Sequence, residues 1–370
     1  MHDHAQAEGM SVDLEPVLSD LLDQAISEHA FPGAVLAVGS SRGLAETMAA
    51  GNHTYAGERP TRADDLFDLA SLTKVVCTTS VAMRLHGRGL LDLAAPVGTL
   101  LPDFLSSAKA APERREATVA HLLAHCAGFP SWLPFHSQPL GTAAERRQRV
   151  LDTPLASAPT ETMVYSDIGL ITLGFLLAEQ TGVPLAELVQ LEVCAPLGMG
   201  ETQYTPSAAL AARCVPTECD ATGVPLQGIV HDENARWLDG VAGHAGLFAP
   251  VADLARLGSC LLGGGEPVFC PTTLARFTKP AGFVPGSARC LGWGGIEGMC
   301  SGGQYLGPNS YGHTGFTGTS FWVDPDHDLY IILLTNAVHP KREDKANGFF
   351  PWRRRLHEAV YATLGLAHRI

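Results

Sequence analysis

The order of the predicted elements restricts the possible folds of this chain more than any other feature of its sequence. Apolar residues at helical spacing over 14–26 predict a helix, and "AVLAVGS" with the pieces after it predicts a strand and a hairpin. Short helical patterns fill the middle, and two strands around "DPDHD" and a helix over 352–364 close the chain. A sheet built from both ends must therefore accommodate a helical insertion.

We expect an α/β (α+β) fold, with an antiparallel sheet flanked by the N- and C-terminal helices and an inserted, mainly helical domain. The predicted sheet domain is residues 13–70 plus 241–370, and the predicted helical domain is residues 71–240. Residues 1–12 are expected to be disordered, and residues 262–310 read as a glycine-rich loop. A cleft between the two domains is the default place for a site.

The composition of the chain argues against a nucleic acid as a partner and against a membrane span. The chain has 25 Lys and Arg against 38 Asp and Glu, a formal net charge of −13, so most of its surface would repel a nucleic acid. No apolar run is long enough to predict a membrane span. The polar start lacks the pattern of a secretory signal, so we expect a cytoplasmic protein, or a periplasmic or extracellular one if a leader has been removed.

The nine cysteines are scattered, with no C-x-x-C pair. This odd number without a framework predicts reduced and mostly buried thiols rather than a disulfide scaffold.

The motif "SLTK" places Ser71 and Lys74 one helical turn apart at the start of an apolar helical pattern. A serine hydroxyl needs a neighbouring group to take its proton, and a helix start aims backbone N–H groups at an oxyanion. A second pair of the same spacing, Ser106 and Lys109, lies in a polar stretch that reads as a solvated loop. We therefore favour Ser71 as a nucleophile.

Two further clusters fit the same chemistry. Tyr165, Ser166 and Asp167 precede an apolar helix, and His313-Thr314-Gly315 is expected to begin a strand, with a glycine that lets a substrate approach the backbone. In this order and with these gaps, "SLTK", "YSD" and "HTG" resemble the penicillin-recognising serine hydrolases. That family includes class C β-lactamases, D,D-peptidases and family VIII carboxylesterases, and the resemblance covers residues 15 to 365.

The resemblance implies a role for each matching residue. Ser71 would be the acylated nucleophile, Lys74 its proton partner and Tyr165 the general base. The backbone N–H groups of Ser71 and Phe316 would form the oxyanion hole, with Thr314 and Gly315 lining the substrate strand. No metal and no organic cofactor is implied.

Two positions depart from the β-lactamase pattern. Asp167 stands where Asn is usual, and its carboxylate should keep Lys74 protonated and favour Tyr165 as the base. His313 replaces a lysine that pairs with the β-lactam carboxylate, and an ordinary imidazole is only partly charged at neutral pH. We therefore expect at most weak β-lactamase activity.

Two segments, "VHDENARWLDGVAGHAGLF" at 230–248 and "LLTNAVHP" at 333–340, resemble the branch of penicillin-binding protein 4B and cell-wall-associated β-lactamase homologues. This implies a substrate related to peptidoglycan fragments. The first segment makes His231, Asp232 and His244 candidate cleft residues, although it can equally fix the architecture of the cleft.

The sequence supports a metal site or an α/β-hydrolase nucleophile less well. His231, Asp232 and His244, and the pair His121 and His125, lack a recognised set of metal ligands. The motif G-x-S-x-G at 39–43 is typical of the nucleophile elbow of α/β-hydrolases, but no substantial helix follows it, so a hairpin turn explains it better.

The sequence thus predicts a serine hydrolase that acts through a Ser71 acyl-enzyme on small esters, D-amino-acid peptides or peptidoglycan fragments. The alternative is a catalytically weak penicillin-binding protein that senses cell-wall fragments. Both take a small-molecule ester, peptide or cell-wall-derived ligand.

Overall fold

The computed structural model describes residues 13–106, 112–298 and 300–368. Five strands form an antiparallel sheet in the order β2-β1-β8-β7-β6. Their bounds are β1 Gly33–Ser40, β2 Gly43–Gly51, β6 Tyr311–Thr314, β7 Ser320–Asp324 and β8 Leu329–Thr335. Strands from the two ends of the chain meet at the β1–β8 pair, which confirms the predicted sheet.

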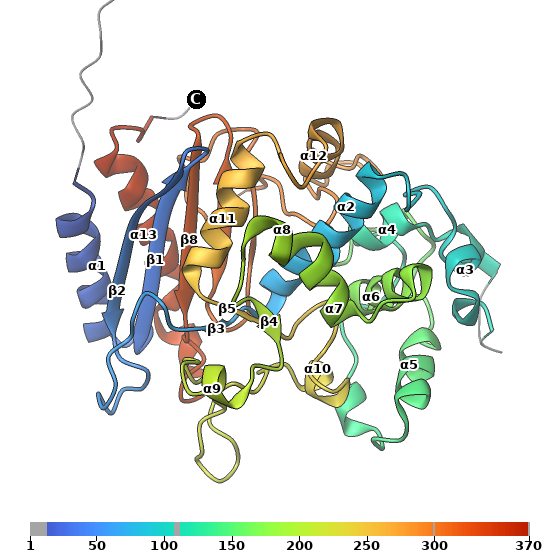
Figure 1. Cartoon of the computed structure of the whole chain (residues 1–370), viewed down its shortest axis with the longest axis horizontal. Helices are drawn as coiled ribbons and strands as arrows, with labels where there is room; N and C mark the ends of the chain where they lie inside the picture. The colour runs from blue at the N-terminus through green and yellow to red at the C-terminus, as the bar shows by residue number, and fades with distance from the viewer. Residues whose placement is uncertain (1–12, 107–111, 299, 369–370) are drawn as a thin grey trace, which may run out of the picture.

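The sheet is buried on both faces because alternate side chains of its central strands enter different cores. On β1, Leu36 and Val38 point into one apolar cluster, while Val35 and Ala37 point into the other. One face is covered by α1 (Glu15–Ser27) and α13 (Phe349–Thr363), and the opposite face by α11 (Val251–Leu262), as Figure 1 shows. The predicted terminal helices are therefore confirmed.

The helices between β3 (Phe67–Asp68) and β5 (Leu247–Ala249) pack together beside the sheet, on the side of α11 (Figure 1). A second, small sheet joins these two strands to β4 (Gln203–Tyr204). The helices of this part are α2 Ser80–Gly87, α3 Val97–Leu100, α4 Val119–Leu123, α5 Ala143–Leu151, α6 Asp167–Thr181, α7 Leu185–Val189, α8 Ala195–Leu197, α9 Ala208–Ala211 and α10 Glu233–Trp237. The assignment of residues 71–240 to a domain of their own stays a prediction.

Helix α6 has a capping residue at each end. The Ser166 hydroxyl accepts a hydrogen bond from the Gly169 N–H, and Gly182 adopts the left-handed conformation with φ 67° before Pro184. Within the described ranges, no single helix combines the length and apolar content needed to cross a membrane. Helix α6 and the residues after it are apolar enough together, but the chain bends by 82° between them.

Three details differ from the expectations. Residues 262–310 contain a helix, α12 (Pro271–Thr278), whose Leu274 and Phe277 are buried near α2. The region after residue 310 forms three strands rather than two, so the His313 motif ends β6 instead of beginning a strand. The expectation for residues 1–12, and that for Lys109, lie outside the described residues.

Other expectations hold. Ser41 lies in the turn that joins β1 to β2, where its hydroxyl donates to Asp328, so the G-x-S-x-G motif is a hairpin turn. All nine cysteines lie in the described ranges and are unpaired, and seven of them are buried, the exceptions being Cys219 and Cys270.

Candidate active site

Ser71 lies in a tight turn that is held by buried polar groups. A 3₁₀ turn (Ala70–Leu72) leads into a π-helical turn (Lys74–Thr79) and then into α2, so the predicted helix does begin at Ser71. Ala70 has φ 45°, a strained value for a residue with a side chain. The fully buried Asp68 carboxylate accepts hydrogen bonds from the Ala70 N–H at 2.8 Å and the His231 N–H at 2.6 Å. These two hydrogen bonds hold the Ser71 turn against the residues that precede α10.

The ammonium of Lys74 is completely buried and is surrounded by oxygen acceptors. Its Nζ lies 2.8 Å from Ser71 Oγ, 2.8 Å from Asp167 Oδ1 and 3.3 Å from the His244 carbonyl oxygen. Burial alone would lower the pKa of Lys74, but the Asp167 carboxylate and Tyr165 outweigh it and raise this pKa. The Ser71 hydroxyl, the Asp167 carboxylate and the His244 carbonyl are thus all close enough to stabilise an ammonium at this position.

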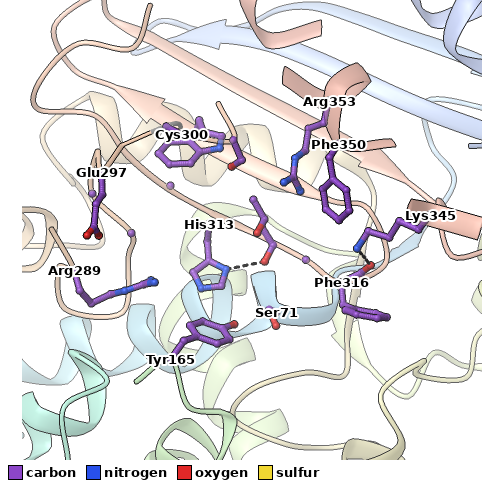
Figure 2. A pocket seen from close by; sticks show the side chains of 17 residues that line it. Ser71, Tyr165, Arg289, Glu297, Cys300, His313, Phe316, Lys345, Phe350 and Arg353 are labelled. Carbon is purple, nitrogen blue, oxygen red and sulfur yellow. Dashed lines mark hydrogen bonds between the residues drawn. The ribbon is translucent and has the colours of Figure 1, made fainter. Parts of the chain in front are cut away.

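Tyr165 lies against the same ammonium. Lys74 Nζ is 4.8 Å from the centroid of its ring, and Figure 2 shows the Tyr165 hydroxyl pointing toward Ser71. Tyr165 and Asp167 lie on either side of Ser166, the N-cap residue of α6, so the phenol and the carboxylate both reach Lys74 from the start of this helix. The ring is held between His125, at 4.7 Å between centroids, and His313, at 5.7 Å.

His313 lies at the end of β6 with its imidazole nearly enclosed. Its Nδ1 donates to the Thr314 carbonyl at 2.9 Å, which leaves Nε2 as an acceptor without a partner among the described residues. Burial, together with the nearby charges of Arg289 and Lys74, holds the pKa of His313 well below its ordinary value. The direction of this shift disfavours the partly charged His313 that the motif leads one to expect.

Gly315 allows two chain segments to approach closely. A Cβ at this position would come within 2.1 Å of Thr319 Oγ1 and 2.6 Å of the Leu69 carbonyl oxygen. The glycine thus serves the contact between the β6–β7 turn and the Ser71 segment, and it also lines the larger cavity at Ser71; its role in the approach of a substrate stays a prediction. In the described part of the chain, the N–H groups of Ser71 and Phe316 donate to no backbone acceptor.

Residues 230–248 also contribute to the site around Ser71 and Lys74. The His231 ring stacks on Phe316 at 5.6 Å, and its Nε2 lies 3.0 Å from Glu218. Asp232 caps α10 and lies 2.9 Å from Nε2 of His244, which lowers the pKa of Asp232 although burial opposes this. His231 and Asp232 line a cavity. His244 contacts Lys74 through its backbone carbonyl, which accepts a hydrogen bond from the ammonium.

Two cavities meet at Ser71, and both are also lined by Tyr165 and Phe316. The larger, of about 580 Å³, extends along β6 toward Arg289 and the start of α13 (Figure 2). The smaller, of about 320 Å³, is bounded by Trp132, His231 and Asp232.

A family model described as Beta-lactamase matches residues 18–350. The chain belongs to this family. The nucleophile, lysine and tyrosine positions predicted from the sequence all converge on one site of this β-lactamase-related protein.

Its relatives carry names from cell-wall chemistry. A protein of Bacillus subtilis named N-acetylmuramyl-L-alanine amidase is 33% identical over 84% of this chain and 78% of its own length. A putative D-alanyl-D-alanine carboxypeptidase of Escherichia coli is 31% identical over 76% of this chain and 72% of its own length.

Solved structures share the fold. EstCE1, described as a hydrolase with promiscuous acyltransferase activity, superimposes with a TM-score of 0.76 at 23% identity, over 94% of this chain and 98% of EstCE1. A class C β-lactamase of Rhodobacter sphaeroides superimposes with a TM-score of 0.70 at 19% identity, over 94% and 98% of the two chains. The β-lactamase-type fold expected from the sequence is confirmed.

Asp167, Asp232 and His244 bring three potential metal-ligand atoms within 4.8 Å of one another. The ammonium of Lys74 already supplies a cation beside this group, because it pairs with Asp167 and donates to the His244 backbone carbonyl. This β-lactamase-related site is therefore organised around a lysine.

Three residues of the site were not predicted from the sequence. His125 supports the Tyr165 ring and accepts the Ser166 N–H on Nδ1, and its unusual φ of 56° could not be read from the letters. Asp68 holds the nucleophile turn through contacts that exist only in the fold. Arg289 comes from the glycine-rich region, and its guanidinium lies 5.6 Å from the centroid of the Tyr165 ring.

We predict that Asp68→Ala destabilises the fold and slows turnover. The substitution leaves the buried N–H groups of Ala70 and His231 without an acceptor, at roughly 1–3 kcal/mol for each. Urea denaturation should show this loss, while Asp64→Ala, whose side chain is 70% exposed, should change the free energy of unfolding by less than about 0.5 kcal/mol. Equal stability of the two variants would refute the role given to Asp68.

Proposed function

We propose that this serine hydrolase acts through an acyl-enzyme on Ser71, with Tyr165 as the general base and Lys74 as a permanent cation. The observation that carries the assignment is the ion pair between Lys74 Nζ and Asp167 Oδ1 at 2.8 Å. This carboxylate raises the pKa of Lys74, and a protonated amine has no electron pair with which to take the serine proton. The phenol of Tyr165, beside this cation, is then the group left to act.

In this proposal the Ser71 Oγ attacks the carbonyl carbon of an ester or amide while its proton passes to Tyr165. The carbonyl oxygen takes up the negative charge and accepts hydrogen bonds from the N–H groups of Ser71 and Phe316. Tyr165 then returns the proton to the leaving alcohol or amine as its bond to carbon breaks. Water, or another acceptor, releases the acyl group by the reverse path.

The larger cavity favours a substrate with a carboxylate next to the scissile bond. The lowered pKa of His313 disfavours a positive charge there, so we assign the contact with the substrate carboxylate to Arg289, which lines the same cavity. Among the described residues no carboxylate pairs with Arg289, whose guanidinium lines the cavity with Tyr165 and His313. A D-amino-acid peptide with a terminal carboxylate has this chemistry, in keeping with the carboxypeptidase name of one relative.

Ser71→Ala should abolish both turnover of an aryl ester and covalent labelling. Intact mass spectrometry after a rapid acid quench should find the acyl group on the wild-type peptide that contains Ser71. Ser41→Ala is the matched control, since Ser41 lies in an exposed turn and should leave both signals intact. Labelling of wild-type protein without turnover would instead favour the cell-wall-sensing alternative, and loss of activity in Ser41→Ala would refute the assignment.

The roles of Tyr165, Lys74 and Asp167 predict how strongly each substitution slows acylation and how that effect depends on pH. Tyr165→Phe and Lys74→Ala should each slow acylation by roughly 10²- to 10⁴-fold. Asp167→Asn removes the group that raises the pKa of Lys74, so acylation by this variant should be close to the wild-type rate near pH 6 and fall steadily toward pH 9 as Lys74 loses its proton. Wild-type enzyme, whose Lys74 pKa is raised, should show no such fall from Lys74.

Stopped-flow acylation rates for the three variants would measure this. If Tyr165→Phe acylates at the wild-type rate, Tyr165 leaves the mechanism and a neutral Lys74 takes its place.

A further inference from the structure

The larger cavity has a cationic lining, although the chain as a whole is strongly acidic. Arg289 stands at one end, and Lys345 and Arg353 stand at the other, against the single carboxylate of Glu297. Lys345 lies in a 3₁₀ turn (Asp344–Asn347) and Arg353 in the first turns of α13, and Figure 2 shows the Phe350 ring between their side chains. We call Lys345, Phe350 and Arg353 the far cationic end.

Both cations of the far cationic end are buried without an anion. Lys345 is 7% and Arg353 is 8% exposed, and in the described ranges neither forms an ion pair with a carboxylate. Lys345 donates to the Phe316 carbonyl, and Arg353 Nε has no hydrogen-bond partner among the residues that the structure describes. Their nearest stabilising neighbours are aromatic: Lys345 Nζ is 4.4 Å from the ring centroid of Phe316, and Arg353 Cζ is 5.6 Å from that of Phe350.

Aromatic rings compensate only part of the cost of burying charge. Burial lowers the pKa of Lys345 to about 8, with a further contribution from Arg353, and burial lowers the pKa of Arg353 to about 10. Buried charges are ordinarily paired, so an anion that enters here would relieve an existing cost. Guanidinium groups favour carboxylates in particular, because two parallel N–H groups match the two oxygens.

The far cationic end is separate from Arg289. In Figure 2, Arg289 and the far cationic end lie on opposite sides of His313 and Ser71. The charges that act on Arg289 come from its own end, Tyr165 and Glu297 among them, whereas Lys345 responds to Arg353. One carboxylate on Arg289 would thus leave the other end unoccupied.

We propose that Lys345 and Arg353 form a second anion subsite, which binds a carboxylate of the substrate other than the one held by Arg289. This inference rests on the proposed function, because Ser71 has to lie between the two anionic groups. The substrate class that it predicts is a small ester, peptide or sugar–peptide fragment with at least two anionic groups, and not a monoester of a neutral acid.

Three boronic acids provide a test: phenylboronic, 3-carboxyphenylboronic and 3,5-dicarboxyphenylboronic acid. The Ser71 oxygen donates an electron pair to boron and its proton passes to the base, so each inhibitor is anchored at the same atom and the inhibitors differ only in carboxylates. Competitive Ki values are measured for wild-type enzyme and for Arg353→Met, Lys345→Met and Arg289→Met. Arg355→Met is the matched control, since Arg355 is an exposed residue of the same helix that stacks on Trp352.

In wild-type enzyme the second carboxylate should lower Ki by about tenfold, as expected for hydrogen bonds to a charged group. This ratio of Ki values, mono- to dicarboxylate, should fall to about one in Arg353→Met and clearly decrease in Lys345→Met, but should persist in Arg355→Met. Arg289→Met should instead reduce the gain from the first carboxylate. A ratio uses only the folded, inhibitor-binding protein, so partial unfolding of a variant does not mimic the effect.

The inference is overturned if no second-carboxylate gain exists, or if the gain survives both Arg353→Met and Lys345→Met. Failure of all three boronic acids to bind Ser71 is a different result, because it would refute the proposed nucleophile and this inference with it.

Discussion

The structure of the site depends on one buried positive charge. A lysine ammonium without solvent would cost several kcal/mol if it were unpaired, and here the Asp167 carboxylate, the His244 carbonyl and the Ser71 hydroxyl replace its hydration shell. Each acceptor comes from a different part of the chain, so the charge stabilises the fold only when those parts meet. Assembly of the fold and assembly of the site are therefore the same event around Lys74.

The acceptors stay in place because the segments that carry them are fastened to one another. The Thr319 hydroxyl donates to the Leu69 carbonyl and the Thr317 hydroxyl to the Asp68 carbonyl, which join the β6–β7 turn to the Ser71 segment. Asp68 joins that segment to His231. Strands contributed by the C-terminal part of the chain thus hold a nucleophile from its N-terminal part against the segment that supplies the His244 carbonyl.

Much of this could be predicted from the sequence, for a physical reason. Helical spacing predicted α1, a short apolar run predicted β1, and an apolar run between a capping serine and a glycine predicted α6, because these local features specify the elements. Ser71, Lys74 and Tyr165 could be found because they lie in short motifs with a known order. Arg289, Asp68 and the far cationic end could not be found, because their importance comes from burial, charge and hydrogen bonding in the folded chain and not from a local motif. The lowered pKa of His313 could not be predicted either, since burial is a property of the fold and not of the motif.

The most direct test of this account is the charge of Lys74 in the free enzyme. With lysines labelled at Cε and Nζ, NMR chemical shifts can be followed from about pH 6 to 10, and the Lys74→Arg variant assigns the signal. The account predicts that Lys74 keeps its proton across this range, while Lys345, whose pKa is lowered to about 8, titrates within it and serves as an internal reference. A Lys74 signal that titrates near neutral pH would contradict the account and make the neutral amine the base.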